Sequence, residues 1–149
     1  MDLKHIFRGD TKAEIPLPEK RMSVLHEIGN ILIEKFDRTF ETCVKNANKS
    51  AVKLLEIVVN NFPCFQDEGL YKGTKLSFYK RAQILVGDMW NFFDGAGAGE
   101  FYDIDKITMF ADYRVPQVLV YFGVMSYSDQ LMEKSQKGLL IINYYQGVI

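Results

Sequence analysis

This 149-residue sequence is poor in the residues that build metal centres and disulfide frameworks, with two cysteines and two histidines. Cys43, Cys64, His5 and His26 do not follow the spacing of metal ligands, so the sequence predicts no metal or other cofactor. A disulfide between the two cysteines is the less favoured alternative, and we expect free thiols in a reducing compartment.

An excess of one charge and long apolar runs are also lacking. The 18 basic and 19 acidic residues give a formal net charge of −1, so no overall field would recruit nucleic acid or an anionic membrane. No apolar segment is long enough to span a bilayer, and the first residues lack the apolar core of a secretion signal. We therefore expect a soluble, cytoplasmic protein with no direct nucleic-acid or membrane partner.

Apolar residues at helical spacing are what the sequence does contain. A hydrophobic fraction of 48% and an aromatic fraction of 13% are typical of a packed core rather than of a disordered chain. Apolar residues recur at three- and four-residue steps, and Ser50, Asp103 and Ser128 stand where helix caps are expected. The expected helices are 21–36, 39–47, 51–62, 78–93, 104–110, 116–122 and 128–137.

The predicted fold class is all-α, in a single helical domain. Residues 67–75, which include Gly69 and Gly73, are expected to form a loop, and Gly138 is expected to end the last helix. Residues 139–145 are apolar and β-prone, which is typical of an exposed, aggregation-prone end. Along helix 78–93 an apolar face is expected to point inward, formed by Ala82, Leu85, Val86, Met89, Trp90 and Phe93.

Residues 108–117 carry the most informative local pattern, because a carboxylate, a guanidinium and two aromatic rings precede a proline. Pro116 suits the first turn of a helix, and Val115 is therefore expected to end the preceding segment. Asp112, between Phe110 and Tyr113, would lie at a junction between helices, where its carboxylate could be partly removed from water.

Two interpretations of Asp112 remain open at this point. A partly desolvated carboxylate can stabilise a developing cation. Alternatively, Asp112 pairs with Arg114 or caps the helix that begins at Pro116, and local sequence alone favours this second interpretation.

Three basic residues are candidates for holding an anionic substrate group, namely Lys80, Arg81 and Arg114. Lys80 and Arg81 stand at the start of a helix, where positive charge opposes the helix dipole, so an anionic partner would explain their position. A solvated helix face is an equally good explanation. The glycines of residues 95–99 follow a helix rather than a strand, which favours a flexible connector over a phosphate-binding loop.

A longer pattern resembles a known family. The segments 78–90, 101–104 and 108–119 are similar to the queuosine salvage proteins, which are queuosine 5′-phosphate N-glycosylases. The run Arg8-Gly9-Asp10-Thr11 and the helix 25–36 resemble an earlier segment of that family, so the similarity extends from about Leu3 to Lys137.

The resemblance implies a fold, an activity and a set of site residues. The fold would be all-helical and similar to helix-hairpin-helix DNA glycosylases. The activity would be hydrolysis of the N-glycosidic bond of queuosine 5′-monophosphate, a free nucleotide, which releases queuine for tRNA modification. Asp112 matches the family's catalytic aspartate in Phe-Ala-Asp-Tyr-Arg. Phe110 or Ala111 would line the base pocket, Phe110 or Tyr113 would cover the base, and Lys80, Arg81 or Arg114 would hold the 5′-phosphate.

The chain also departs from that family, whose members are longer at both ends. Residues 1–138 would form the central part of the glycosylase domain, and residues 139–149 a divergent tail. Neither His5 nor His26 matches the family's pocket histidine, and the acidic residues that its C-terminal part supplies are missing. We therefore expect a truncated isoform, a fragment or an incomplete gene model. The alternative functions are a non-catalytic truncated form and a helical interaction module.

Overall fold

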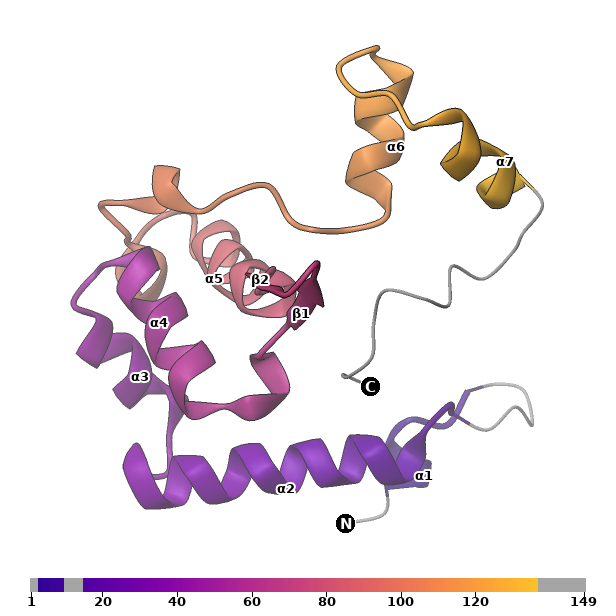
Figure 1. The fold of residues 1–149 in the computed structure, drawn as a ribbon. Helices are drawn as coiled ribbons and strands as arrows, with labels where there is room; N and C mark the ends of the chain where they lie inside the picture. The colour runs from indigo at the N-terminus through magenta and orange to yellow at the C-terminus, as the bar shows by residue number, and fades with distance from the viewer. Residues whose placement is uncertain (1–2, 10–14, 137–149) are drawn as a thin grey trace. The chain divides into compact units, whose positions relative to one another are not determined.

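The computed structural model of the chain describes residues 3–9 and 15–136, which are mostly helical with one small sheet (Figure 1). The chain divides into two compact units, Met1–Asn46 and Ala47–Ile149, and each is described by itself. The helices are α1 (Leu3–Ile6), α2 (Pro18–Lys35), α3 (Phe40–Ala47), α4 (Ala51–Asn61), α5 (Lys80–Phe92), α6 (Arg114–Tyr121) and α7 (Asp129–Gln136). The strands are β1 (Glu68–Tyr71) and β2 (Thr74–Ser77), and the short 3₁₀ helices are η1 (Pro63–Phe65), η2 (Gly97–Gly99) and η3 (Ile104–Lys106).

Helix α2 dominates the first unit and begins at Pro18, three residues before the position expected from the apolar pattern. Proline suits this first position because its missing N–H would have no partner within the helix. The side chain of Arg21 donates a hydrogen bond to the carbonyl of Pro16 at 2.9 Å, which holds the chain at this end. The apolar side chains of α2 are incompletely covered, since Leu25 is 51% and Ile33 is 58% exposed.

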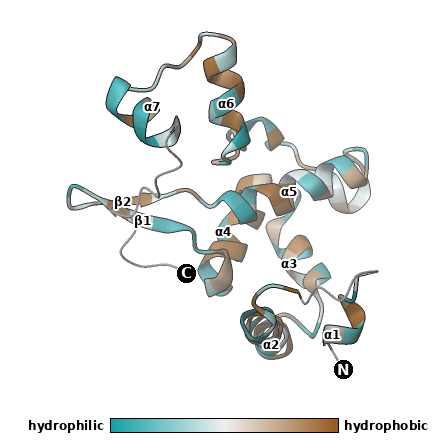
Figure 2. Cartoon of the chain, turned by 90° about the vertical axis from the view of Figure 1, so that its right-hand side faces the viewer, coloured by the Kyte–Doolittle hydropathy of each residue, from teal (hydrophilic) through white to brown (hydrophobic). Residues whose placement is uncertain are grey.

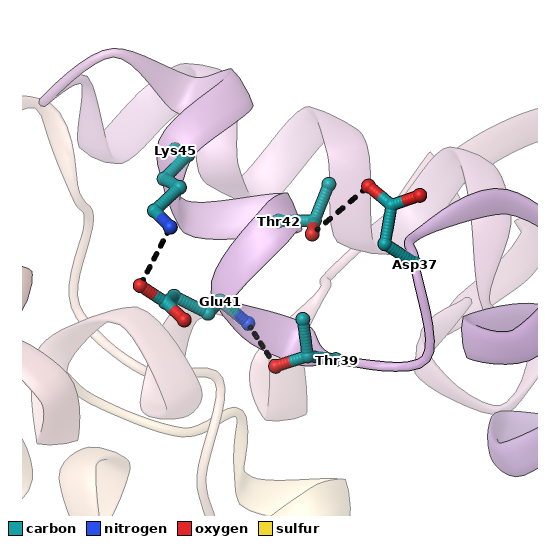
Figure 3. A network of polar contacts seen from close by, with 5 residues as sticks. All are labelled: Asp37, Thr39, Glu41, Thr42 and Lys45. Atoms are coloured by element: carbon teal, nitrogen blue, oxygen red, sulfur yellow. Dashed lines mark hydrogen bonds and ion pairs between the residues drawn. The ribbon is translucent and has the colours of Figure 1, made fainter.

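A polar network defines the turn between α2 and α3 (Figure 3). Asp37 has a φ of 52°, in the left-handed region, and reverses the chain. Thr39 accepts a hydrogen bond from the N–H of Glu41 at 3.2 Å, and the hydroxyl of Thr42 donates to Asp37 at 3.5 Å. Lys45 pairs with Glu41 one turn away at 2.7 Å. These contacts fix the beginning of α3, where helix 39–47 was expected.

The core of the second unit forms where α4 packs against α5. Leu54 and Val58 of α4, and Phe62 directly after it, are almost completely buried. Across from them, Ala82 and Val86 of α5 are buried completely. The Ser50 cap is confirmed, since its hydroxyl accepts a hydrogen bond from the backbone N–H of Lys53 at 3.1 Å.

The prediction of a loop at residues 67–75 was wrong, because β1 and β2 form an antiparallel hairpin there. Lys72 and Gly73, at the tip, both have positive φ, as a two-residue hairpin turn requires. Lys75 pairs with Glu68 across the strands at 2.7 Å. The strands have no buried face, so they lack the alternation of apolar and polar residues that reveals a strand in a sequence. The expected all-α class is therefore corrected to mostly helical with a two-stranded sheet.

Helix α5 begins at Lys80 rather than at Phe78, because Ser77 belongs to β2 and does not cap the helix. The expected inner face of α5 is correct in its first half only. Trp90 and Phe93 are each 42% exposed. Their rings lie near the end of α5, where Gly95 turns the chain away with a φ of 67°.

Asp103 does not cap a helix over residues 104–110, since only Ile104–Lys106 form a short 3₁₀ helix. Its carboxylate instead accepts hydrogen bonds from the hydroxyl of Ser50 at 2.7 Å and from the N–H of Ala51 at 2.6 Å. The beginning of α4 is therefore capped from a segment more than 50 residues away in the sequence. A local pattern cannot reveal such a cap.

Helix α6 begins at Arg114, so Pro116 is its third residue and Val115 lies inside the helix rather than before it. Helix α7 has the expected cap, because Ser128 accepts a hydrogen bond from the N–H of Leu131 at 3.3 Å. The predicted stop at Gly138 and the predicted tail 139–149 lie outside the described residues. Among the described helices, none is long and apolar enough to cross a membrane.

Candidate functional site

Asp112 lies in the connection between η3 and α6, and each of its carboxylate oxygens has a partner. Oδ2 contacts the ammonium of Lys80, the first residue of α5, at 2.6 Å. Oδ1 accepts a hydrogen bond from the backbone N–H of Arg114 at 2.8 Å. The side chains of Asp112 and Lys80 are 23% and 30% exposed, so the pair is accessible from solvent but partly shielded.

These partners keep the carboxylate ionised. The hydrogen bond from Lys80 is the main cause that holds the pKa of Asp112 below its ordinary value of 3.8, and the N–H of Arg114 adds to it. Partial desolvation opposes this shift, and the positive charges of Lys80 and Arg114 reinforce it. Asp112 is therefore a fixed negative charge at neutral pH, which is the state needed to stabilise a developing cation.

Of the two interpretations of Asp112 from the sequence, the structure tests only the second, which is correct in part. Its carboxylate binds the N–H of the first residue of α6, as a residue near a helix start often does. Its ion-pair partner, however, is Lys80 rather than Arg114. The guanidinium of Arg114 lies 5.3 Å from the ring centre of its neighbour Tyr113.

The base of the hairpin positions Lys80. The carbonyl of Asp67 accepts hydrogen bonds from the N–H groups of Phe78 and Tyr79, at 2.8 and 3.4 Å. The carboxylate of Asp67 accepts from the N–H of Lys80 at 3.3 Å, and the hydroxyl of Tyr79 donates to Glu68 at 3.0 Å. Asp67 thus has two roles: its carbonyl closes the hairpin, and its carboxylate caps α5.

Two contacts hold the segment before Asp112 on α5. The buried side chain of Gln83 accepts hydrogen bonds from the N–H and the hydroxyl of Thr108, at 2.9 and 2.7 Å. The ring of Phe110 lies over Gly87, where an added Cβ would stand 3.1 Å from the ring. Sequence reasoning missed Gln83 and Gly87. The only available signal was that Gln83 stands one helical turn after Lys80.

The remaining candidate residues are more exposed. Tyr113 is 67% exposed, and Ala111, Arg114 and Arg81 are exposed as well. The structure therefore brings Lys80 and Asp112 together at the start of α5 and places the ring of Phe110 over Gly87, about two turns further along. It leaves Arg81 and Tyr113 open to solvent.

Metal-ligating residues do not gather at this site. Within residues 3–9 and 15–136 there is no group of three or more His, Cys, Asp or Glu side chains that could hold a metal ion. Neither Cys43 nor Cys64 forms a disulfide, as expected, and burial raises the pKa of the Cys43 thiol to about 11.

Comparison with known proteins identifies the family. A family model for the queuosine salvage protein matches residues 1–145. The chain belongs to the queuosine salvage protein family. The site described above therefore lies wholly within the part of the chain that this family shares.

Three relatives carry the name queuosine 5′-phosphate N-glycosylase/hydrolase. The mouse protein (Mus musculus) is 50% identical over 95% of this chain and 42% of its own length. The proteins of Nematostella vectensis and Sphaerobacter thermophilus are 54% and 44% identical, over 94% and 89% of this chain and over 40% and 41% of their own lengths. The chain thus spans about two-fifths of the length of these members of the queuosine salvage family.

Proposed function

We propose that this chain carries the catalytic carboxylate of an N-glycosyl hydrolase that releases queuine from queuosine 5′-monophosphate, with Asp112 as that carboxylate. The observation that carries the proposal is the ionised Asp112, held by Lys80 and by the N–H of Arg114 in a chain of the queuosine salvage family. The names of the relatives give the substrate class.

The chemistry of the bond suits this arrangement. When the N-glycosidic bond breaks, its electron pair leaves with the nitrogen of the base, and positive charge builds on the sugar. A fixed carboxylate stabilises that charge or orients the water molecule whose oxygen then bonds to the anomeric carbon. Phe110, Ala111 and Tyr113 flank Asp112 and would line the pocket of the flat base by stacking and contact.

Lys80, Arg81 and Arg114 are the proposed ligands of the 5′-phosphate. Lys80 has further N–H donors beside the one that contacts Asp112, so it can hold a phosphate oxygen and the carboxylate together. The exposed guanidinium groups of Arg81 and Arg114 are suited to bidentate contacts with phosphate.

The finer features of the fold and setting belong to the same proposal. We propose a helix-hairpin-helix glycosylase-like architecture, with residues 1–138 as the central part of the domain and residues 139–149 as a divergent tail. The partner would be the free nucleotide rather than intact tRNA, in the cytoplasm. The coverage of about 40% of the relatives' length supports the description of residues 1–138 as one part of a longer domain.

The first test is release of queuine from queuosine 5′-monophosphate by the purified chain and by Asp112→Asn. Asparagine keeps the shape of aspartate but removes the charge, so release is expected to disappear while the fold is retained. Asp105→Asn is the matched control, because Asp105 is 70% exposed and pairs with Lys106, its neighbour in η3. Equal release by the wild-type chain and Asp112→Asn would rule out the catalytic assignment.

The phosphate ligands are tested one at a time with Lys80→Ala, Arg81→Ala and Arg114→Ala. Replacing a residue that binds the phosphate is expected to raise KM for queuosine 5′-monophosphate and to leave KM for dephosphorylated queuosine unchanged. Lys106→Ala, an exposed basic residue of η3, is the control for net charge. A variant whose KM for the phosphorylated substrate equals that of the wild type is not a phosphate ligand.

A non-catalytic interaction module is the second candidate function, and exposed apolar residues favour it. Helix α6 is largely hydrophobic (Figure 2), and Tyr121, Phe122 and Val124 at its end are 83%, 71% and 73% exposed. Such a patch marks a protein interaction site in many soluble proteins. A thermal transition that rises with protein concentration would support this candidate, and a concentration-independent monomer would exclude self-association.

A further inference from the structure

Gln83 is a buried polar residue of α5 and lies three residues after Lys80. It is 8% exposed, and both ends of its amide are used. The oxygen accepts the two hydrogen bonds from Thr108, and the nitrogen donates to the carbonyl of Phe78 at 3.0 Å. A buried amide with this set of partners has one orientation, because turning it over would bring donors to donors.

These hydrogen bonds connect the two segments that meet in the Lys80–Asp112 pair. Phe78 stands two residues before Lys80, and Thr108 stands four residues before Asp112. Gln83 and Thr108 are 25 residues apart in the sequence, so no local structure would otherwise bring them together. Between Thr108 and Asp112, the ring of Phe110 rests over Gly87 one turn further along α5.

We propose that Gln83 is a positioning residue for Asp112. Its amide fixes the segment from Thr108 to Asp112 against the first turns of α5, so that the carboxylate meets Lys80. The catalytic meaning of this role rests on the proposed function, whereas the positioning itself does not. Gln83 touches neither the carboxylate nor the ammonium through any hydrogen bond of the structure, so it acts through the backbone of the two segments.

The test replaces the amide and follows Asp112 itself. In Gln83→Met the side chain keeps its length but loses all its hydrogen bonds. In Thr108→Val, at an exposed position, the hydroxyl is lost and the N–H is kept, which makes this the milder variant. Ser50→Ala is the matched control, because Ser50 is 6% exposed and hydrogen-bonded but serves the other helix of the core, α4.

The readout is the titration of the Asp112 carboxyl carbon by NMR, with aspartate labelled with ¹³C and Asp112→Asn for assignment. In the wild type, Lys80 of α5 and Arg114 of α6 face the carboxylate and lower its pKa. In Gln83→Met the pKa is expected to rise toward 3.8, with a smaller rise in Thr108→Val and none in Ser50→Ala. If Gln83→Met does not fold, Thr108→Val decides.

Two results would overturn the positioning role. One is an unchanged titration of Asp112 in a folded Gln83→Met variant. If that variant does not fold, the same result in Thr108→Val overturns the role. The other is an equal shift in Ser50→Ala, which would indicate general loosening of the core. Queuine release provides a separate readout, in which kcat of an active chain is expected to fall about 10- to 100-fold in Gln83→Met. If the wild-type chain releases no queuine, the proposed function fails for this chain, and the titration still decides the role of Gln83.

Discussion

Replacing Asp103 with alanine is expected to destabilise the second unit more than any replacement of an exposed acid nearby. Asp103 accepts hydrogen bonds from the hydroxyl of Ser50 and from the N–H of Ala51, so it links the loop before η3 to the start of α4. Alanine at this position leaves that N–H without its partner and removes a negative charge from a helix N-terminus.

The magnitude follows from these contacts. A hydrogen bond to a charged group contributes about 1.5–3 kcal/mol, and a helix cap about 1 kcal/mol. Because Asp103 is half-buried, water replaces part of what is lost, and we expect a net destabilisation of about 2 kcal/mol. For a chain of this size that corresponds to a fall in Tm of about 4–8 °C.

The assay is urea and thermal unfolding followed by circular dichroism at pH 7, with Asp105→Ala as the matched control. Asp105 lies two residues further on, is 70% exposed and pairs with its neighbour Lys106, at 3.3 Å. An exposed pair of this kind contributes little, so Tm is expected to stay within about 2 °C. Equal effects of Asp103→Ala and Asp105→Ala would refute the reasoning.

The pH dependence gives a second check on Asp103. Partial burial alone would raise its pKa, but the hydrogen bonds from Ser50 and from the N–H groups of Ala51 and Val52 outweigh burial and hold the pKa below 3.8. A group with a lowered pKa in the folded state contributes stability above its unfolded pKa and loses it as the pH falls through its folded pKa. The difference in stability between wild type and Asp103→Ala is therefore expected to be constant above about pH 5 and to shrink below pH 4.

Further predictions concern buried thiols and glycines. Burial raises the pKa of Cys43 to about 11, so at pH 8 a thiol reagent is expected to modify the half-buried Cys64 first in the native chain. Cys43 is expected to react only after unfolding in urea, and equally fast modification of both thiols in the native chain would contradict this. Gly99→Ala is expected to destabilise by about 1–3 kcal/mol, because the new Cβ would stand 2.5 Å from the carbonyl oxygen of Met89. Gly29→Ala, within α2 with nothing within 4 Å, is expected to stabilise by about 0.5–1 kcal/mol in the same urea titrations, and a loss of stability would contradict it.

The helices of the fold could be predicted because their signals are local. The apolar residues of α4 recur at helical spacing, and Ser50 stands directly before them, so both the helix and its cap followed from adjacent residues. The hairpin could not be predicted in this way. Its strands bury no face, and its glycines suggested a loop. The start of α5 was misplaced as a consequence, because the residues before Lys80 belong to β2 and to its connection.

The candidate site shows the same limit more sharply. Asp112 was singled out by the local pattern of residues 108–117 and then by the family resemblance, and Lys80 by its unfavourable position at a helix start. That the two residues meet at 2.6 Å depends on the tertiary structure, because they are far apart in the sequence. The position of Gln83 one helical turn after Lys80 was too weak a signal, since a glutamine within a helix is ordinarily a surface residue and its partner Thr108 lies 25 residues away.

The closure of the hairpin at Asp67 has a consequence for engineering the chain. Because the carbonyl of Asp67 binds the N–H of Phe78, the path from α4 to α5 leaves the helical core and returns to the same place. The two strands thus form a hairpin that projects from the connection between α4 and α5, and its tip at Lys72 and Gly73 is exposed. A peptide tag or a fluorophore at this tip is expected to leave Lys80 in place, since insertions at exposed loop tips are well tolerated.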